Sequence, residues 1–245
     1  MIISVINHKN SSGKSTTSVN LAAALSYGSP ESILLIDFDP QSSSSHWLGI
    51  KNSEFNIYKS IQSKEELKPI AINGNINLIP ANLDLSKMEY EQNSVEGREL
   101  ALKQIIEKDN IHKRFNYIII DCPSNLGLLT LNAIVASNEL IVPISMRTNY
   151  AQITGTIKNF TDIIRTKYNP NLAAPWHLPN YYDKNLKSDL GALEVLKKEK
   201  CFKSIIHKDN SFSESYSKNK TIIEFNSTCS GAIDFFKLAK EVRGL

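Results

Sequence analysis

Short runs of β-branched and other apolar residues alternate along the chain with longer segments whose apolar positions have helical spacing. Strands are expected at 3–6, 33–37, 76–80, 117–121 and 139–144. Helices are expected over most of 14–27, 84–108, 126–137, 150–167, 186–199 and 231–243. This alternation predicts βα units and a mainly parallel sheet that is buried on both faces. The predicted fold class is α/β, with a single doubly wound sheet flanked by helices.

The composition is that of a globular protein and adds few constraints. The chain has 245 residues, of which 41% are hydrophobic and 22% charged, so we expect one domain over 1–245. The serine run 42–45 follows an Asp-Phe-Asp-Pro-Gln segment and is interpreted as a mobile loop beside a site. We expect no helix-turn-helix domain before residue 1, because no sequence precedes Met1.

The expected location is the cytoplasm. The apolar segment 1–7 is short and has no basic region before it, and no apolar run is long enough to span a membrane. The three cysteines, Cys122, Cys201 and Cys229, are odd in number and lack metal-ligand spacing, which favours a reducing compartment. A glycosylation site at Asn10 is therefore not expected.

The segment 7–16, NHKNSSGKST, lies between the first predicted strand and the first predicted helix. Ligands bind to open α/β sheets at this position. Gly13 allows close approach of the backbone to a phosphate, Lys14 adds a cation, and the Ser15 hydroxyl can ligate Mg²⁺. His8 stands where the ordinary phosphate-loop pattern has glycine. The segment thus predicts a phosphate loop of unusual sequence.

A second lysine, Lys9, lies five residues before Lys14, and this pair gives the segment a specific resemblance. KNSSGKST resembles the deviant Walker A motif of the ParA/MinD family, Lys-Gly-Gly-x-Gly-Lys-Thr/Ser-Thr. The resemblance implies an ATPase that uses ATP and Mg²⁺ and forms a nucleotide-sandwich homodimer. Lys9 would contact the phosphates of the other subunit, and Lys14 those of its own. The implied nucleotide-binding residues are Lys9, Asn10, Ser11, Ser12, Gly13, Lys14, Ser15, Thr16 and Asn180.

Two further segments resemble the switch motifs of this family. The stretch 37–41, DFDPQ, is similar to switch I, which implies that Asp39 orients the attacking water and Asp37 lies in the outer coordination sphere of the metal. The stretch 117–123 resembles a Walker B strand, with Asp121 where a hydrated Mg²⁺ would lie. The implied catalytic residues are Lys9, Lys14 and Asp39, and the implied metal residues are Ser15, Asp37 and Asp121.

The resemblance covers nearly the whole chain, with some departures. It continues through 124–134, 77–89, 180–199 and 231–242. Ser124 replaces a usual proline, so switch II is expected to be less rigid. Asn180 is a candidate for reading the adenine edge, and a plain loop asparagine is the alternative.

The family divides mainly into DNA-partitioning ATPases and membrane-associated division-site ATPases. The apolar residues of the last predicted helix are spaced as in a helix that packs on a protein core; they are Ile233, Phe235, Phe236, Ala239 and Val242. Stable membrane association is therefore not expected. Lysines concentrate between 197 and 220, which is typical either of a surface for non-specific DNA binding or of a merely solvated face. The candidate DNA contacts are Lys197, Lys198, Lys200, Lys203, Lys208, Lys218 and Lys220.

The resulting hypothesis is a ParA-like ATPase that segregates a plasmid or chromosome together with a ParB-type centromere-binding partner. The alternatives are a hydrolysis-impaired regulator or scaffold of the same fold and a MinD-like positioning ATPase. Position 11 is the expected weak point of the loop, because serine tolerates a left-handed backbone less well than glycine or asparagine, at a cost of roughly 1 to 2 kcal/mol. The chain is expected to close and hydrolyse less well if Ser11 is strained in this way.

Overall fold

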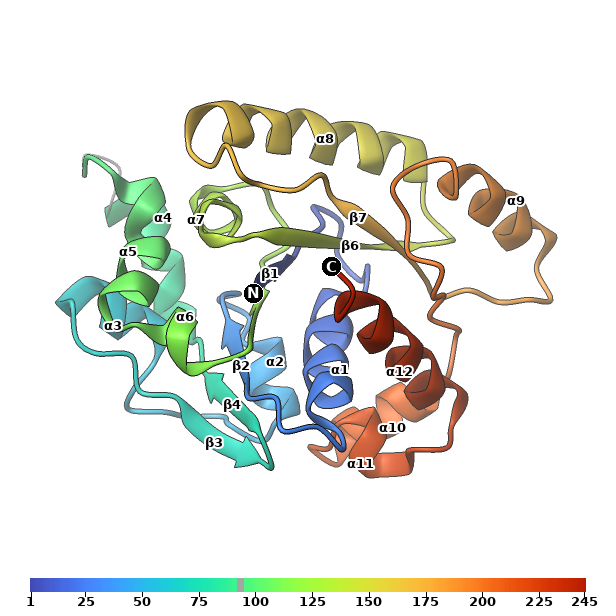
Figure 1. The fold of residues 1–245 in the computed structure, drawn as a ribbon, viewed down its shortest axis with the longest axis horizontal. Helices are drawn as coiled ribbons and strands as arrows, with labels where there is room; N and C mark the ends of the chain where they lie inside the picture. The colour runs from blue at the N-terminus through green and yellow to red at the C-terminus, as the bar shows by residue number, and fades with distance from the viewer. Residues whose placement is uncertain (92–94) are drawn as a thin grey trace.

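The structure is a computed structural model that describes residues 1–91 and 95–245. One sheet has the strand order β3-β4-β2-β5-β1-β6-β7, and all its neighbouring strands are parallel except the antiparallel pair β3 and β4 (Figure 1). The strands are β1 (Ile2–Val5), β2 (Ile33–Asp37), β3 (Ile70–Asn73), β4 (Ile76–Ile79), β5 (Tyr117–Asp121), β6 (Glu139–Ser145) and β7 (Trp176–Asn180). The predicted fold class is confirmed.

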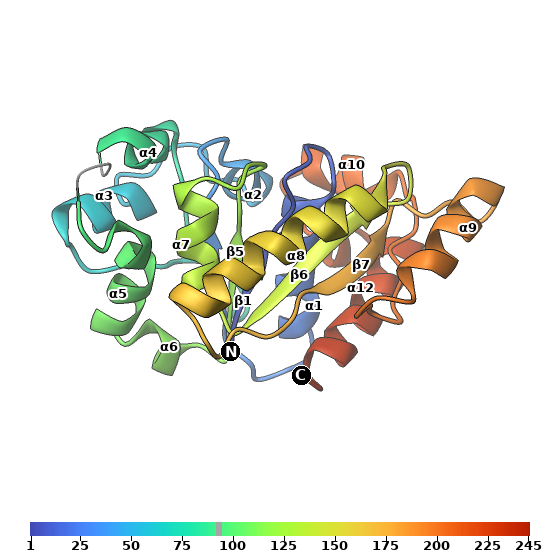
Figure 2. The same ribbon diagram turned by 90° about the horizontal axis from the view of Figure 1, so that it is seen from above.

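Helices cover both faces of this sheet (Figure 2). One apolar core lies between the sheet and α1, α11 and α12, and the other lies between the sheet and α5, α7 and α8. The helices are α1 (Lys14–Ser26), α2 (Ser43–Trp47), α3 (Ile57–Ser63), α4 (Met88–Glu91), α5 (Ala101–Lys108), α6 (Ile111–Arg114), α7 (Leu128–Ala136), α8 (Tyr150–Lys167), α9 (Lys187–Leu196), α10 (Ser211–Ser217), α11 (Ile222–Asn226) and α12 (Ser230–Val242), with 3₁₀ segments η1 (Leu83–Lys87) and η2 (Arg98–Leu100).

The central strands agree best with the sequence pattern. Every residue of β2 and β5 is buried, as expected for parallel strands covered on both faces. The predicted helix at 150–167 is observed with these bounds as α8. Continuous apolar runs and long amphipathic segments therefore predict both the type and the bounds of these elements.

Helices fill most of the described part of 84–108, as predicted, but they do not form one continuous helix. The described part of this segment contains η1, α4, η2 and α5, while 92–94, within the predicted helix, lie outside the described residues. Gly97 has a φ of 75°, a left-handed conformation that directly precedes η2 and is incompatible with a continuous α-helix.

Two strands were missed by the hydrophobic pattern. The edge strand β7 contains Pro179, and proline is tolerated at sheet edges because it does not need to donate a ladder hydrogen bond there. The other edge strand, β3, is joined to β4 by the two residues Gly74 and Asn75, and a Gly-Asn pair between two strands is a common hairpin signal. Short edge strands thus carry little apolar periodicity.

The serine run is not the predicted mobile loop. Ser43–Trp47 forms α2, in which Ser44 and Ser45 are buried and hydrogen-bonded to carboxylates. The core prediction for α12 is also wrong at one position, because Ile233 is 43% exposed and Ala232 and Leu238 are buried instead. Among the described residues, no helix is long and apolar enough to cross a membrane.

The sheet topology brings the sequence motifs together. Strand β5 lies between β1 and β2, with Asp121 in register with Val5 on one side and Asp37 on the other. The phosphate loop after β1, the switch I segment after β2 and the switch II segment after β5 therefore meet at one edge of the sheet, the edge near α2 and α10 in Figure 2.

Candidate nucleotide-binding site

A cavity of about 430 Å³ opens where these three segments meet. Its volume lies within the range of ordinary ligand pockets. Most of the predicted site lines it, because the whole of 10–16 contributes together with Asp39 from switch I and Ser124 from switch II. The remaining lining residues are Gln41, Ser43, Trp47, Tyr181 and Tyr216.

The backbone of the phosphate loop is held in a left-handed conformation at two positions. Ser11 has a φ of 55° and Gly13 a φ of 92°. Left-handed backbone at a non-glycine residue costs roughly 1 to 2 kcal/mol, so the strain predicted at position 11 is confirmed. Asn10 has a negative φ, so the tolerance of asparagine for left-handed backbone is not used here.

Gly13 is also required for space. A Cβ atom at this position would lie 2.0 Å from Nδ2 of Asn180, far inside van der Waals contact. That Nδ2 atom donates a hydrogen bond of 2.8 Å to the Ser12 carbonyl, and Oδ1 accepts one of 2.9 Å from the Tyr181 amide. Asn180 is thus the buried last residue of β7 and supports the phosphate loop from behind, whereas its adenine contact stays a prediction.

The two lysines of the loop have opposite environments. Lys14 is 5% exposed, and its Nζ donates to Ser124 Oγ at 2.6 Å and to the Lys9 carbonyl at 3.3 Å. Burial lowers the pKa of Lys14, and the negative charges of Asp121 and Asp39 oppose this shift. The Lys9 side chain is exposed and forms no hydrogen bond or ion pair within the described part of the chain.

Ser124 links switch II to the phosphate loop. The sequence predicts reduced rigidity from the loss of a proline at this position, and that prediction stays untested. The Ser124 hydroxyl, however, accepts the shorter of the two hydrogen bonds from Lys14. The serine that stands where the family motif has proline therefore forms a direct contact between the phosphate loop and the switch II segment.

Two buried carboxylates lie under the cavity and do not line it. Asp121 Oδ1 accepts from Ser18 Oγ at 3.1 Å, and Oδ2 accepts from Ser44 Oγ at 2.6 Å. Asp37 Oδ2 accepts from the amide and the hydroxyl of Ser45 at 2.8 and 2.7 Å. Burial raises the pKa of both carboxyl groups, and for Asp37 the neighbouring charge of Asp121 raises it further.

The donor set around Asp121 fits a magnesium ion. The Ser15 hydroxyl lies near enough to Asp121 to lower the pKa of that carboxyl group, so a hydroxyl that lines the cavity and a carboxylate beneath it are neighbours. Among the described residues, no group of three or more His, Cys, Asp or Glu side chains could hold a metal alone. Mg²⁺ does not require such a group, because it keeps several waters and takes other ligands from substrate phosphates.

Buried polar atoms without a partner lie beside the cavity. The Ser12 hydroxyl is 2% exposed and has no hydrogen-bond partner among the described residues, and the nearby Thr17 hydroxyl has none either. Buried hydroxyl groups without partners are rare because they cost free energy. Together with the start of α1 at Lys14, these groups fit an anionic ligand such as a phosphate chain.

Asp39 lies at the rim of the cavity and is half-buried. Its Oδ1 accepts a hydrogen bond of 2.9 Å from the Gln41 amide, and its own amide donates to Asp37 Oδ1 at 3.2 Å. The turn thus presents one carboxylate to the cavity and places the other beneath it. This arrangement suits a residue that orients a water molecule.

Several residues at the site were not predicted. Ser18, Ser44 and Ser45 bind the two carboxylates, and Trp47, Tyr181 and Tyr216 line the cavity. The serine run beside the switch I motif was the only available signal for the hydroxyl groups. The aromatic residues come from separate segments whose proximity depends on the tertiary fold.

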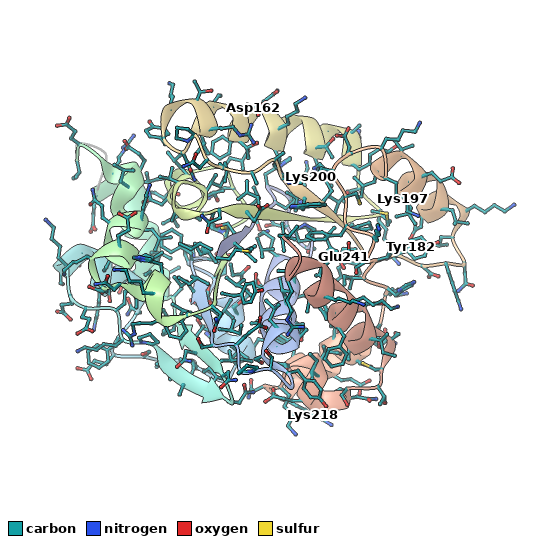
Figure 3. All side chains as sticks on the ribbon, in the orientation of Figure 1. Asp162, Tyr182, Lys197, Lys200, Lys218 and Glu241 are labelled. Carbon is teal, nitrogen blue, oxygen red and sulfur yellow. The ribbon has the colours of Figure 1, made fainter. Side chains whose placement is uncertain are left out.

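The lysines predicted to contact DNA do not form one cluster. Lys197 and Lys200 lie beside α9, while Lys218 lies at the far side of the molecule beside α10 and α11 (Figure 3). Lys200 donates to the Ala174 carbonyl at 2.8 Å and lies 4.2 Å from the centre of the Trp176 ring, so it is already engaged. The other six are exposed, although the Lys218 Nζ lies 5.0 Å from the centre of the Phe225 ring.

The chain matches the family described as an AAA domain over residues 1–174. It is 32% identical over 250 residues to the sporulation initiation inhibitor protein Soj of Bacillus subtilis, covering 98% of this chain and 97% of that protein. It is 31% identical to the chromosome-partitioning ATPase Soj of Treponema pallidum, covering 97% and 94%.

The chain belongs to the ParA-type family of P-loop ATPases.

A solved structure gives a further comparison for this ParA-type chain. Cobyrinic acid a,c-diamide synthase from Mycobacterium smegmatis, with bound ADP and magnesium, superimposes with a TM-score of 0.83 at 25% identity, covering 99% of this chain and 93% of that one. A synthase and the partitioning relatives thus share one nucleotide-binding fold. The fold alone does not separate these functions.

Proposed function

We propose that this ParA-type chain is a Mg²⁺-dependent ATPase that segregates DNA as an ATP-bound homodimer. The support comes from the two Soj relatives, which cover at least 97% of the chain, and from the cavity that the phosphate loop and both switch segments form. The environment of the two lysines carries the proposal: Lys14 is buried in its own site, while Lys9 is exposed and unpaired within the described residues.

Each site residue has a defined task in this proposal. Lys14 neutralises the phosphates of the same subunit, and Ser15 and Asp121 hold the metal, which when bound neutralises charge on the transferred phosphoryl group. Asp39 orients the attacking water from the cavity rim. Phosphoryl transfer depends mainly on such positioning and on electrostatic stabilisation.

Lys9 supplies the second positive charge from the other subunit. Its exposed ammonium group is free to reach the phosphates of a partner copy across a two-fold interface. A dimer of this kind buries both nucleotides between the subunits, so dimerisation depends on the nucleotide. Ser11 lies at the same rim and is exposed, so its side chain would contact the approaching partner backbone.

Lys9→Ala tests this arrangement directly. Light scattering after gel filtration in Mg²⁺ and a non-hydrolysable ATP analogue is expected to give dimers for the wild type and mainly monomers for Lys9→Ala. Lys51→Ala, which removes another exposed lysine outside the cavity lining, serves as the matched control and should still dimerise. A nucleotide-dependent dimer of unchanged stability in Lys9→Ala would exclude the cross-subunit role.

DNA binding is assigned to Lys218 and Lys220 rather than to all seven lysines between 197 and 220. Tyr216 lines the nucleotide cavity, so the following residues up to Lys220 lie at the edge of the sheet where the cavity opens. A dimer doubles this surface and binds bivalently, which raises affinity without new contacts. Binding of this type is independent of sequence and falls steeply with salt.

Fluorescence anisotropy with unrelated duplexes measures this binding. We expect DNA affinity only with Mg²⁺ and ATP. The logarithm of this affinity should fall linearly with the logarithm of the salt concentration, and the slope should become shallower by about 1 for each DNA-contacting lysine that is removed. The variants are Lys218→Ala and Lys220→Ala, with Lys200→Ala as the engaged control. Retention that is indifferent to nucleotide and salt would contradict the partitioning mechanism.

A ParB-type centromere-binding protein is the proposed partner, and the nucleoid is the proposed location. The partner stimulates hydrolysis and thereby releases the dimer from DNA. Phosphate release should therefore rise when DNA and the protein encoded beside this gene are both added. Nucleotide binding without any turnover under these conditions would instead support a regulator or scaffold, which the strained Ser11 also favours.

A further inference from the structure

Helix α2 contacts the magnesium site on one side. The Ser44 hydroxyl donates to Asp121 Oδ2 at 2.6 Å, and the Ser45 hydroxyl donates to Asp37 Oδ2 at 2.7 Å. Both serines are at most 1% exposed. Successive residues of one short helix thus bind the two carboxylates that end β2 and β5.

The same helix contacts the lysine-bearing segment 216–220 on its other side. The Trp47 indole Nε1 donates a hydrogen bond of 2.8 Å to the Lys220 carbonyl. Its ring lies edge-on to the Tyr216 ring, with centroids 5.3 Å apart and planes at 90°. At the end of the helix, a Cβ on Gly49 would lie 3.6 Å from the Asn219 side chain, so the two backbones are close.

Through these contacts the short helix α2 joins the carboxylates of β2 and β5 to segment 216–220. Trp47 is only 5% exposed, although it lines the nucleotide cavity. Ser42 precedes the helix with a φ of 55°, so the chain enters α2 through a strained turn. Ser44 and Trp47 lie three residues apart in this five-residue helix, so both contacts belong to one helical turn.

Metal binding acts directly on the Ser44 contact. Both oxygens of Asp121 already accept hydroxyl hydrogen bonds from the protein. Each of these oxygens has a further acceptor site, so Asp121 could bind the metal or its water while it still accepts from Ser44. A cation held there would draw charge from the carboxylate and thereby weaken the hydrogen bond that joins α2 to β5.

We propose that α2 transmits metal and nucleotide binding to segment 216–220, with Ser44 and Trp47 as the positioning residues at its two contacts. The inference rests on the proposed function in two respects, namely the binding of Mg²⁺ and nucleotide at this site and the assignment of Lys218 and Lys220 to DNA binding. The physical link itself runs through Asp121, Ser44, Trp47 and the Lys220 carbonyl. This link gives a role to the indole N–H of Trp47, the only side-chain donor of that residue, which binds a backbone carbonyl of the lysine-bearing segment 216–220.

Hydrogen exchange of the 216–222 amides, followed by mass spectrometry, tests this link. The probe is Mg²⁺ with a non-hydrolysable ATP analogue, compared with the same analogue in excess chelator, at concentrations that saturate each variant. In the wild type, exchange should differ roughly fivefold or more between the two conditions, the lower end of ordinary coupling between sites.

Trp47→Phe keeps an aromatic ring beside Tyr216 and removes the indole donor together with part of the buried ring system, while Ser44→Ala removes only the hydroxyl at Asp121. Each should reduce the difference in exchange to below about twofold, and the double variant should reduce it no further, because both act on one path. His46→Ala is the matched control, since its side chain makes no hydrogen bond within the described residues, and it should retain the wild-type difference.

The possible outcomes separate the link from the proposed function. A full wild-type response in both single variants, or no response in the wild type, would overturn the link. A response that disappears in the variants while the wild type never binds DNA would support the link and refute DNA segregation. If one variant fails to fold by circular dichroism, the other still decides.

Discussion

The phosphate loop and helix α2 border the same cavity and differ in how their polar groups are used. In the loop, the Ser12 hydroxyl has no partner within the described residues, and the exposed Lys9 ammonium has none either. In α2, the buried Ser44 and Ser45 hydroxyls each donate to a carboxylate. The loop keeps free groups at a cost in stability, whereas the helix is bound by the protein itself.

This difference suggests that the loop supplies free energy for ligand binding and that α2 responds to the bound ligand. Preorganised but unpaired donors gain hydrogen bonds only when an anion arrives, so they favour the ligand strongly. Donors that are already paired gain nothing from a ligand and instead change partners. The loop is therefore suited to binding, and α2 to responding.

Removal of the buried cation of the loop should have the largest effect. Lys14→Ala eliminates the charge that faces the phosphates and is expected to lower hydrolysis by about 10³-fold, as for the loss of a transition-state donor. Phosphate release at saturating ATP and nucleotide titration measure it. Lys51→Ala is the control, and activity within about threefold of wild type in Lys14→Ala would show that the loop works without its lysine.

Removal of the rim carboxylate should have a smaller effect on turnover. Asp39→Ala is expected to keep nucleotide binding and to slow hydrolysis by about 10²-fold, because the water loses its orientation. The trapped ATP state should also lengthen DNA retention. Asp84→Ala removes a surface carboxylate that pairs with Lys87 outside the cavity lining, and it should leave both readouts unchanged.

Removal of a paired hydroxyl in α2 should act on folding stability. Ser45→Ala leaves Asp37 Oδ2 with a backbone donor only, so the free energy of unfolding should fall by about 1 to 3 kcal/mol. Urea unfolding of the nucleotide-free protein gives this value. Ser43→Ala is the matched control, because Ser43 is half-buried and its hydroxyl is not bonded within the described residues. Equal losses in both variants would contradict the role of the carboxylate contact.

Relief of the backbone strain in the phosphate loop should have the smallest effect on the free energy of unfolding. The sign of this change tests whether the strain lies at Ser11. Ser11→Gly removes a left-handed non-glycine residue and should raise the free energy of unfolding by about 0.5 to 1 kcal/mol. Asn10→Gly, at a negative φ, should lower it by about 0.5 to 1 kcal/mol, because glycine only adds unfolded-state entropy there. Changes of the same sign in urea unfolding would place the strain elsewhere.

Sequence patterns predicted the parts of the molecule that depend on local or repeated signals. The apolar runs of β2 and β5 and the long amphipathic α8 were located correctly because burial on defined faces imposes their periodicity. The placement of Gly13 and Lys14 followed from the chemistry of phosphate binding. Short edge strands such as β7 carry no comparable signal.

The contacts around the carboxylates depend on tertiary structure and were not accessible from sequence. The serine run does not reveal which hydroxyl faces Asp121 and which faces Asp37, because that choice follows from how α2 packs on the sheet. The Trp47 contact with Lys220 joins residues 173 positions apart. The distribution of the lysines over two sides of the molecule also depends on the tertiary fold and could not be predicted from the sequence.

The hydrogen bond from Asn180 to the Ser12 carbonyl has a consequence for biosynthesis. It joins residues 168 positions apart, and its donor is the last residue of the edge strand β7. A nascent chain that has emerged only as far as β6 already contains every residue of the phosphate loop but lacks the side chain that packs against Gly13. The support of the phosphate loop by Asn180 is therefore absent until the seventh strand has been synthesised.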